Sequence, residues 1–160
     1  MKPATLKTTP AVAELGSRCS HTRPSPYVSA VKTKSLLASG TAGRIERLQA
    51  GDMVTTREAA RIAGTTDVTI NDWIAKGRAI GLGLTRSRRG YRMPKWQFEL
   101  GIWTVLPELA QVMGTTEGWA LLSFLESPLG GLNGRTPRQA IEQGEALRVL
   151  QLASVEGDWY

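Results

Sequence analysis

The segment from Met53 to Phe98 constrains the fold more than any other part of the sequence. Thr55 is followed three residues later by Glu58, and this spacing lets the two residues satisfy each other's backbone N–H groups at the start of a helix. The helix is expected to end at Gly64, because glycine enters a positive-φ turn without steric cost. Three small residues on it allow a second helix to cross closely: Ala59, Ala60 and Ala63.

A second helix is predicted over about residues 67–76, with Thr66 or Asp67 as its N-cap. One apolar stripe with helical spacing faces the first helix: Ile70, Trp73 and Ile74. The polar side chains are left on the remaining surface: Thr66, Thr69, Asn71, Asp72 and Lys76. The pattern therefore predicts two crossed helices joined by a tight turn, with one polar surface on the second helix.

The sequence after Gly77-Arg78 is typical of a β-hairpin with a strongly basic tip. Apolar or β-forming runs at 79–84 and 91–93 flank a turn, and five of the ten residues from Arg86 to Lys95 are basic. A solvated surface loop is one interpretation of such a run. Its position directly after two crossed helices instead favours a hairpin that lies along nucleic-acid phosphates.

This stretch resembles the winged helix-turn-helix modules of the excisionase and MerR type. About 45 residues match in order and spacing, through Gly64, Thr69-Ile70, Trp73-Ile74, Gly77-Arg78 and Gly90-Tyr91-Arg92-Met93-Pro94. The resemblance implies that the second helix enters the major groove and that the hairpin, or wing, contacts the DNA backbone. The expected DNA-binding residues are Thr66, Thr69, Asn71, Lys76, Arg78, Arg86, Arg88, Arg89 and Arg92. Asp72 departs from a simple basic helix: it accepts from a cytosine amino group, orients an arginine, or lies off the DNA.

Charge divides the chain into two parts. Residues 1–98 carry 17 Lys and Arg against 6 Asp and Glu, a net charge of +11, whereas residues 99–160 carry 3 against 8, a net charge of −5. A length of 160 residues allows one ordinary domain or two small ones. The basic part suits nucleic acid, and the acidic part suits another protein.

Residues 1–49 are predicted to be a disordered basic leader. Four prolines interrupt any long amphipathic helix there, Pro3, Pro10, Pro24 and Pro26, although the composition also fits an organelle transit peptide. The single cysteine, Cys19, cannot form an internal disulfide and favours a reducing compartment. No apolar run approaches the roughly 20 residues needed to span a bilayer. We therefore expect a cytoplasmic protein with no membrane partner.

Helical periodicity runs through the acidic half. One apolar face extends over 102–113, and Pro107 within it either kinks the helix or begins a new one. A glycine-rich link follows at 129–135, and Thr136-Pro137 then opens another helix in the cap-then-proline order. Residues 99–155 are therefore predicted to form an all-α domain.

The order of these elements resembles the toxin-binding domain of the Xre/MbcA/ParS-type antitoxins, which accompany RES-domain toxins. Roughly 40 residues match, through Phe124-Leu125, Leu129-Gly130, Gly134-Arg135-Thr136-Pro137, Ala140-Ile141, Gly144 and Val149-Leu150. The resemblance implies a RES-type toxin as partner, and any NAD-derived group would belong to that toxin. Arg135 lies in the matched link. Trp103 is added as a partner-binding residue because an exposed tryptophan on a helix is a typical interface anchor. Trp159 and Tyr160 are added because the resemblance implies that the C-terminal region packs against the toxin; the alternative is that they fold back onto the chain's own helices.

Catalytic and metal-binding patterns are missing from the sequence. One histidine, His21, and one cysteine, Cys19, cannot complete a zinc site or supply a supported nucleophile and base. The glycines of the 129–135 link are followed by no Gly-Lys-Ser/Thr, so a turn between helices is favoured over a phosphate loop. We expect no enzyme, no metal and no cofactor.

Together these patterns predict a mainly α protein in four parts. They are a leader at 1–49, a winged helix-turn-helix domain with a small β-hairpin at 50–98, an all-α toxin-binding and dimerisation domain at 99–155, and a tail at 156–160. The expected function is that of an antitoxin and transcriptional autorepressor, a homodimer that binds operator DNA and neutralises a RES-type toxin. The alternatives are a stand-alone phage or plasmid regulator, repressor or excisionase-like, and a protein-binding adaptor, which the basic hairpin disfavours.

Overall fold

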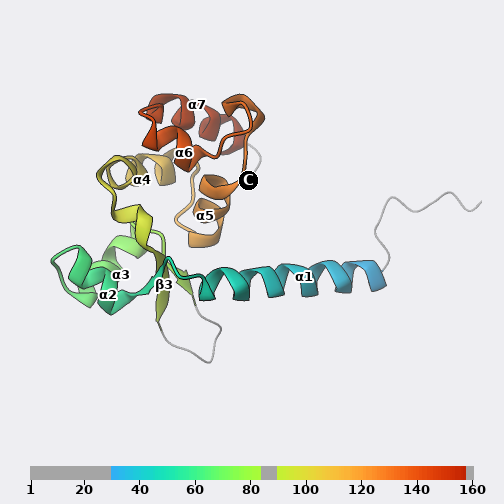
Figure 1. Cartoon of the computed structure of the whole chain (residues 1–160), viewed down its shortest axis with the longest axis horizontal. Coiled ribbons are helices and arrows are strands. Elements are labelled where there is room, and N and C mark those ends of the chain that lie inside the picture. Colours follow the sequence, from blue (N-terminus) through green and yellow to red (C-terminus); the bar gives the residue numbers. More distant parts are fainter. Residues whose placement is uncertain (1–29, 84–89, 158–160) are drawn as a thin grey trace, which may run out of the picture. The chain divides into compact units, whose positions relative to one another are not determined.

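The computed structural model describes residues 30–83 and 90–157 (Figure 1). Within them the chain forms the following elements: α1 (Ala30–Gln49), β1 (Met53–Thr55), α2 (Thr56–Ile62), α3 (Asp67–Ala75), β2 (Leu82–Gly83), β3 (Tyr91–Pro94), the 3-10 helix η1 (Lys95–Phe98), α4 (Leu100–Val112), α5 (Gly118–Glu126), the 3-10 helix η2 (Gly130–Leu132), α6 (Pro137–Glu142) and α7 (Ala146–Gly157). The fold is mainly helical with one small antiparallel sheet, which confirms that the protein is mainly α. Within the same residues, none of the helices combines the length and the apolar character needed to cross a membrane.

Helix α1 corrects the predicted extent of the leader. Residues Ala30–Gln49 are helical, so the expectation of disorder up to residue 49 is wrong for this stretch. The physical reason is that the helix-breaking prolines end at Pro26, and the following residues include several good helix formers, among them leucine, lysine, arginine and alanine. Residues 1–29, with Cys19 and His21, lie outside the described part of the chain.

The described residues from Ser39 onward belong to one compact unit, and the beginning of α1, up to Ala38, belongs to another. The predicted boundary between residues 98 and 99 therefore falls inside a unit. The larger hydrophobic core explains why, because it combines side chains from both sides of that boundary: Met53, Ile80, Leu82 and Trp96 with Ile102, Leu106, Leu109, Leu121, Leu125 and Val149.

Helices α2 and α3 form as the sequence predicts. Thr55 caps α2, and the capping box is complete: the Thr55 N–H donates to Glu58 Oε2 at 2.7 Å, and the Glu58 N–H donates to Thr55 Oγ1 at 3.3 Å. Gly64 has a φ of +64° in the turn between the helices. Ala59 and Ala60 are buried, and with Ile70 and Ile74 they belong to the smaller hydrophobic core. The small side chains thus let the two helices approach closely.

The sheet has the order β1-β3-β2, and both pairings are antiparallel. Its first strand, β1, was not predicted, because three residues before a helix give too short a pattern to identify a strand. Tyr91 to Met93 form most of β3, as expected, and the described part of β2 consists of Leu82 and Gly83. Residues 84–89, which join β2 to β3, lie outside the described residues.

The buried side chain of Gln97 takes the place of a sheet partner for the chain before β2. Gln97 is fully buried; its Oε1 accepts from the Ile80 N–H at 2.6 Å, and its Nε2 donates to the Ile80 carbonyl at 3.2 Å. Both backbone groups of Ile80 are satisfied in this way, so no neighbouring strand is needed there. The arrangement fixes the 79–81 segment against η1.

Helices α4, α6 and α7 pack against one another, seen in yellow to red in Figure 1. Helix α4 continues through Pro107, so this proline does not begin a new helix. The cap-then-proline prediction at Thr136-Pro137 is confirmed, with a complete capping box between Thr136 and Gln139. Asn133, which ends η2, adopts the left-handed conformation at φ 57°, and Gly134 follows at φ 78°, so the 129–135 link is a tight turn between helices.

Candidate nucleic-acid interface

Helix α3 presents one exposed face that packs against nothing in the described residues. Ile70 and Ile74 are buried in the smaller hydrophobic core, which orients the helix. The opposite side carries four exposed residues with the i, i+3, i+4, i+7 spacing of a continuous helical surface: Val68, Asn71, Asp72 and Ala75. This face includes Asn71, as predicted, but also the apolar residues Val68 and Ala75, which the sequence did not indicate.

Thr66 and Thr69 serve the start of α3. Thr66 Oγ1 accepts from the Thr69 N–H at 3.3 Å and lies 3.0 Å from Thr69 Oγ1, so the two hydroxyls also bond each other. This is the N-cap arrangement that satisfies a free backbone donor. Both residues were predicted to face DNA; the structure gives them a capping role, and Thr69 is only half exposed.

The charged residues near the end of α3 are paired. Lys76 Nζ lies 2.8 Å from Asp72 Oδ2, one helical turn apart, and both side chains are largely exposed. The sequence left the role of Asp72 open among three possibilities. In the structure this residue forms an ion pair with Lys76, which offsets its charge. The Arg78 guanidinium lies 5.9 Å from the centre of the Trp73 ring, with the side chain at the surface. Lys76 and Arg78 remain accessible to a phosphate.

Arg92 lies on β3 between the other two strands. Its partner on β1 is Thr55 and its partner on β2 is Leu82. A hollow of about 380 Å³ adjoins it, lined by Thr55, Thr56, Arg57, Asp67, Gly90, Tyr91 and Arg92. The hollow thus brings together the starts of α2 and α3 with the beginning of β3, where the basic loop re-enters the sheet. The loop arginines Arg86, Arg88 and Arg89 lie outside the described residues.

Trp103, one of the predicted partner-binding residues, packs in an aromatic cluster. Its ring lies 5.0 Å from the Trp73 ring in an edge-to-face arrangement and 5.5 Å from the Phe98 ring in a stacked one. The side chain is half-buried. Trp103 therefore connects α4 to α3 within the chain, and part of its surface remains open.

Arg135 holds the turn between η2 and α6. Its guanidinium pairs with Glu145 at 2.7 Å, donates to the Leu132 carbonyl at 3.2 Å and also donates to Gln143 Oε1. The bond from Arg135 lowers the pKa of Glu145 below its usual value. The predicted partner-binding residue thus has internal partners. Trp159 and Tyr160 lie outside the described residues.

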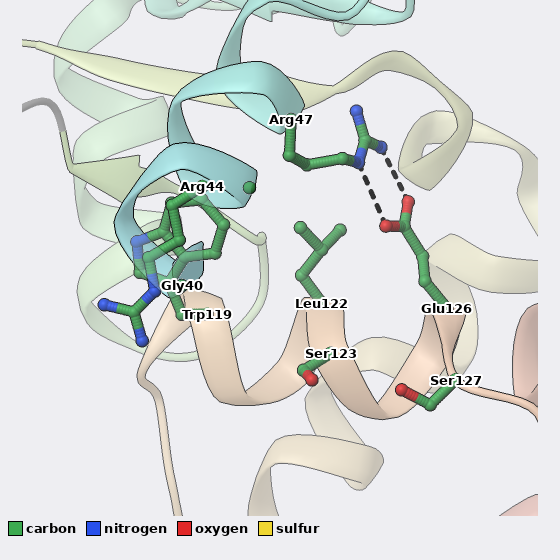
Figure 2. A pocket seen from close by; sticks show the side chains of 9 residues that line it. Gly40, Arg44, Arg47, Trp119, Leu122, Ser123, Glu126 and Ser127 are labelled. Carbon is green, nitrogen blue, oxygen red and sulfur yellow. Dashed lines mark hydrogen bonds and ion pairs between the residues drawn. The ribbon is translucent and has the colours of Figure 1, made fainter. Parts of the chain in front are cut away.

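A second hollow, of about 350 Å³, lies between the end of α1 and α5 (Figure 2). Arg47 joins the two helices there: its Nε and Nη2 donate to both carboxylate oxygens of Glu126 at 2.9 and 2.6 Å, and it also binds Asp52 at 2.8 Å. These carboxylates, Glu126 first, raise the pKa of Arg47. Arg44 lies over the Trp119 ring at 5.1 Å from its centre. These contacts attach the end of α1 to α5.

Metal-binding chemistry is not assembled in the described part of the chain: no three His, Cys, Asp or Glu residues lie close enough together there to hold an ion. Comparison of the chain with protein-family models, with curated proteins and with solved structures finds no match. The functional assignment therefore rests on the residues and their geometry.

Proposed function

We propose that residues 50–98 form a winged helix-turn-helix that binds double-stranded DNA. The observation that supports this most directly is the exposed face of α3. This helix has a capped start and a buried opposite side, and within the described residues Val68, Asn71 and Ala75 are exposed. An α-helix fits the major groove of B-DNA, where base edges can be read. In this proposal β2 and β3 are the stem of the wing.

In the proposed complex, basic side chains around α3 contact the sugar-phosphate backbone of the DNA. Arg57 on α2 and Arg92 on β3 line the hollow beside the start of α3, and Lys76 and Arg78 are exposed at its end. The predicted tip of the wing adds Arg86, Arg88 and Arg89. Contacts of this kind fix the register of a protein on DNA and provide most of its salt-dependent affinity.

The test is the salt dependence of binding to duplex DNA. Replacing Arg86, Arg88 and Arg89 by alanine should flatten the slope of log K against log salt by about two to three units, since each phosphate contact contributes about 0.9. The control variant carries Arg138→Ala and Arg148→Ala, which remove charge from the acidic half and should leave the slope unchanged. Equal slopes for the wing variant and the wild type would overturn the wing assignment.

We further propose that the chain is a cytoplasmic antitoxin and autorepressor, acting as a homodimer, whose acidic half neutralises a RES-type toxin. The support is the sequence resemblance of residues 124–150 and the net charge of −5 on residues 99–160. Arg135, Trp103, Trp159 and Tyr160 are the proposed contacts. Two copies would place two α3 helices on half-sites about one helical turn apart.

Copurification with an untagged toxin tests this second proposal. Deleting residues 158–160 should weaken neutralisation and leave DNA affinity unchanged, whereas the wing variant should do the reverse. A chain that binds operator DNA but neither binds nor neutralises a neighbouring RES-type protein is instead the stand-alone regulator. Mass measurement of the DNA complex gives the number of copies directly.

A further inference from the structure

We infer that α3 reads an A·T-containing site, with Val68 against the 5-methyl group of a thymine and Asn71 on an adjacent adenine. The inference rests on the proposed DNA binding and specifies which bases that binding recognises. Its starting point is Val68, whose side chain is 78% exposed although valine is apolar and β-branched.

The fold gives Val68 no structural role. It belongs to neither hydrophobic core, and it lies in the first turn of α3, where β-branched residues gain nothing for helix stability. Asn71 lies three residues further on the same exposed face, so the two Cβ atoms are about 5–6 Å apart. Side chains at this spacing can reach the same or neighbouring base pairs, which are about 3.4 Å apart along each strand.

The other residues of α3 do not favour guanine as the main target, although an aspartate can accept from the amino group of cytosine. The commonest contact to guanine is a bidentate arginine or lysine, and the helix sequence Asp67–Ala75 contains neither. Lys76, just after the helix, is paired with Asp72. Asp67 and Asp72 only accept hydrogen bonds when ionised, so they disfavour guanine, which presents two acceptors in the major groove.

The remaining groups match an A·T pair. An asparagine amide both donates and accepts, which fits N7 and the amino group of adenine. The thymine methyl is the one apolar feature that bases present in the major groove, and an exposed valine fits it. Ala75 lies one turn after Asn71 on the same face. Its side chain is small, so the helix can approach the floor of the groove closely.

The experiment uses the full chain and duplexes selected from a random pool by binding. In the selected site, each thymine is replaced by uracil, which removes only the 5-methyl group. At one thymine in each half-site, replacement by uracil should weaken binding of the wild-type chain about fourfold, the expected effect of one buried methyl group. With the Val68→Ala variant, which keeps only one methyl group, the difference between the thymine and uracil duplexes should become smaller at that position.

A matched control and a second base analogue complete the test. Leu147→Ala, at a position on α7 that is also 78% exposed, should keep the full difference between thymine and uracil. Replacing the adjacent adenine by 7-deazaadenine, which lacks the N7 acceptor, should weaken the wild type and not the Asn71→Ala variant. Neither Val68 nor Asn71 supports the core, so both variants should fold.

The outcomes separate this inference from the proposed function. Tight DNA binding with no uracil-sensitive position, or sensitivity that is undiminished in Val68→Ala, overturns the inference and leaves DNA binding intact. Absence of any duplex binding overturns both. A wild-type chain whose Val68→Ala variant loses only self-association or toxin binding shows that this face contacts protein, which also overturns the inference.

Discussion

Glu58 connects the start of α2 to the pH dependence of folding. The N–H of Thr55, and then its hydroxyl, donate to the Glu58 carboxylate and lower its pKa below the usual value. A carboxyl whose pKa is lower in the folded than in the unfolded chain adds stability above the unfolded pKa. That contribution is lost as the pH falls through the lowered, folded pKa.

We predict that the Glu58→Gln variant loses this part of the acid sensitivity. Glutamine can still accept from the Thr55 N–H but does not titrate, so the urea midpoint of the variant should fall less than that of the wild type between neutral and acid pH. Carboxyl NMR titration measures the Glu58 pKa itself. A titration at the usual value for glutamate would show that the capping box does not persist in solution.

Gly118 shows how closely the two halves of the chain approach. A Cβ at this position would overlap the carbonyl oxygen of Gly81, so α5 begins directly against the segment before β2. Because the obstacle is backbone rather than a flexible side chain, Gly118→Ala should destabilise the fold by about 3 kcal/mol or more. Denaturant unfolding measures this loss.

The matched control for Gly118 is Gly101→Ala on α4, where a Cβ would meet nothing within 4 Å. Alanine is a better helix former than glycine, so this variant should be neutral or more stable by up to about 1 kcal/mol. Equal effects at the two positions would mean that the close approach of α5 to Gly81 is not present in solution.

Among the elements, the end of α1 is attached to α5 by the ion pairs of Arg47. The side chain is only 20% exposed and bridges two carboxylates, those of Asp52 and Glu126. Arg47→Met should lower the free energy of unfolding by roughly 1–2 kcal/mol, because both ion pairs are lost. The loss is limited because the two partly exposed carboxylates regain some hydration when the guanidinium is removed.

Amide hydrogen exchange locates that effect. Exchange at residues 39–49 should accelerate in Arg47→Met, as the end of α1 loses its attachment to α5. Arg44→Met, which removes a surface guanidinium from the Trp119 ring, should cost less than about 1 kcal/mol. Equal exchange rates at residues 39–49 in Arg47→Met and Arg44→Met would show that the ion pairs of Arg47 do not attach the end of α1 to α5.

Local sequence signals account for much of this architecture. The capping box at Thr55, the cap-then-proline start at Thr136-Pro137 and the turn at Gly64 follow from residues no more than four positions apart, and all three are confirmed. Strand β1 could not be predicted, because it exists through pairing with β3, about 40 residues later. The helix at Ala30–Gln49 was missed because the prolines before it set the expectation for the whole region.

Only part of the candidate interface could be predicted from the sequence. The apolar stripe of Ile70 and Ile74 correctly placed the opposite side of α3 at the surface. The sequence did not indicate that the Thr66 and Thr69 hydroxyls bond each other at the helix cap, or that Val68 is exposed on the same helix. The i, i+4 spacing of Asp72 and Lys76 was the one available sign of their pairing.

On the scale of the whole molecule, the charge division does not coincide with a division of the fold. The basic residues before position 98 and the acidic residues after it belong to regions that share one hydrophobic core. Gln97, fixed to Ile80, lies next to the change of charge and is completely buried. The proposed DNA-binding helix α3 and the acidic region after residue 98 therefore belong to one folded body.

We predict that residues 39–160 unfold in a single cooperative transition. Removing residues 50–98 would take Ile80, Leu82 and Trp96 out of the core that also contains Leu106 and Leu121, and would expose those leucines. Far-ultraviolet circular dichroism and tryptophan fluorescence should give coincident denaturation curves, the expected behaviour of a two-state domain. The fragments 50–98 and 99–160 should each lack the dispersed NMR spectrum of a folded protein. Two separated transitions, or a folded 99–160 fragment, would show instead that the acidic half is a domain in its own right.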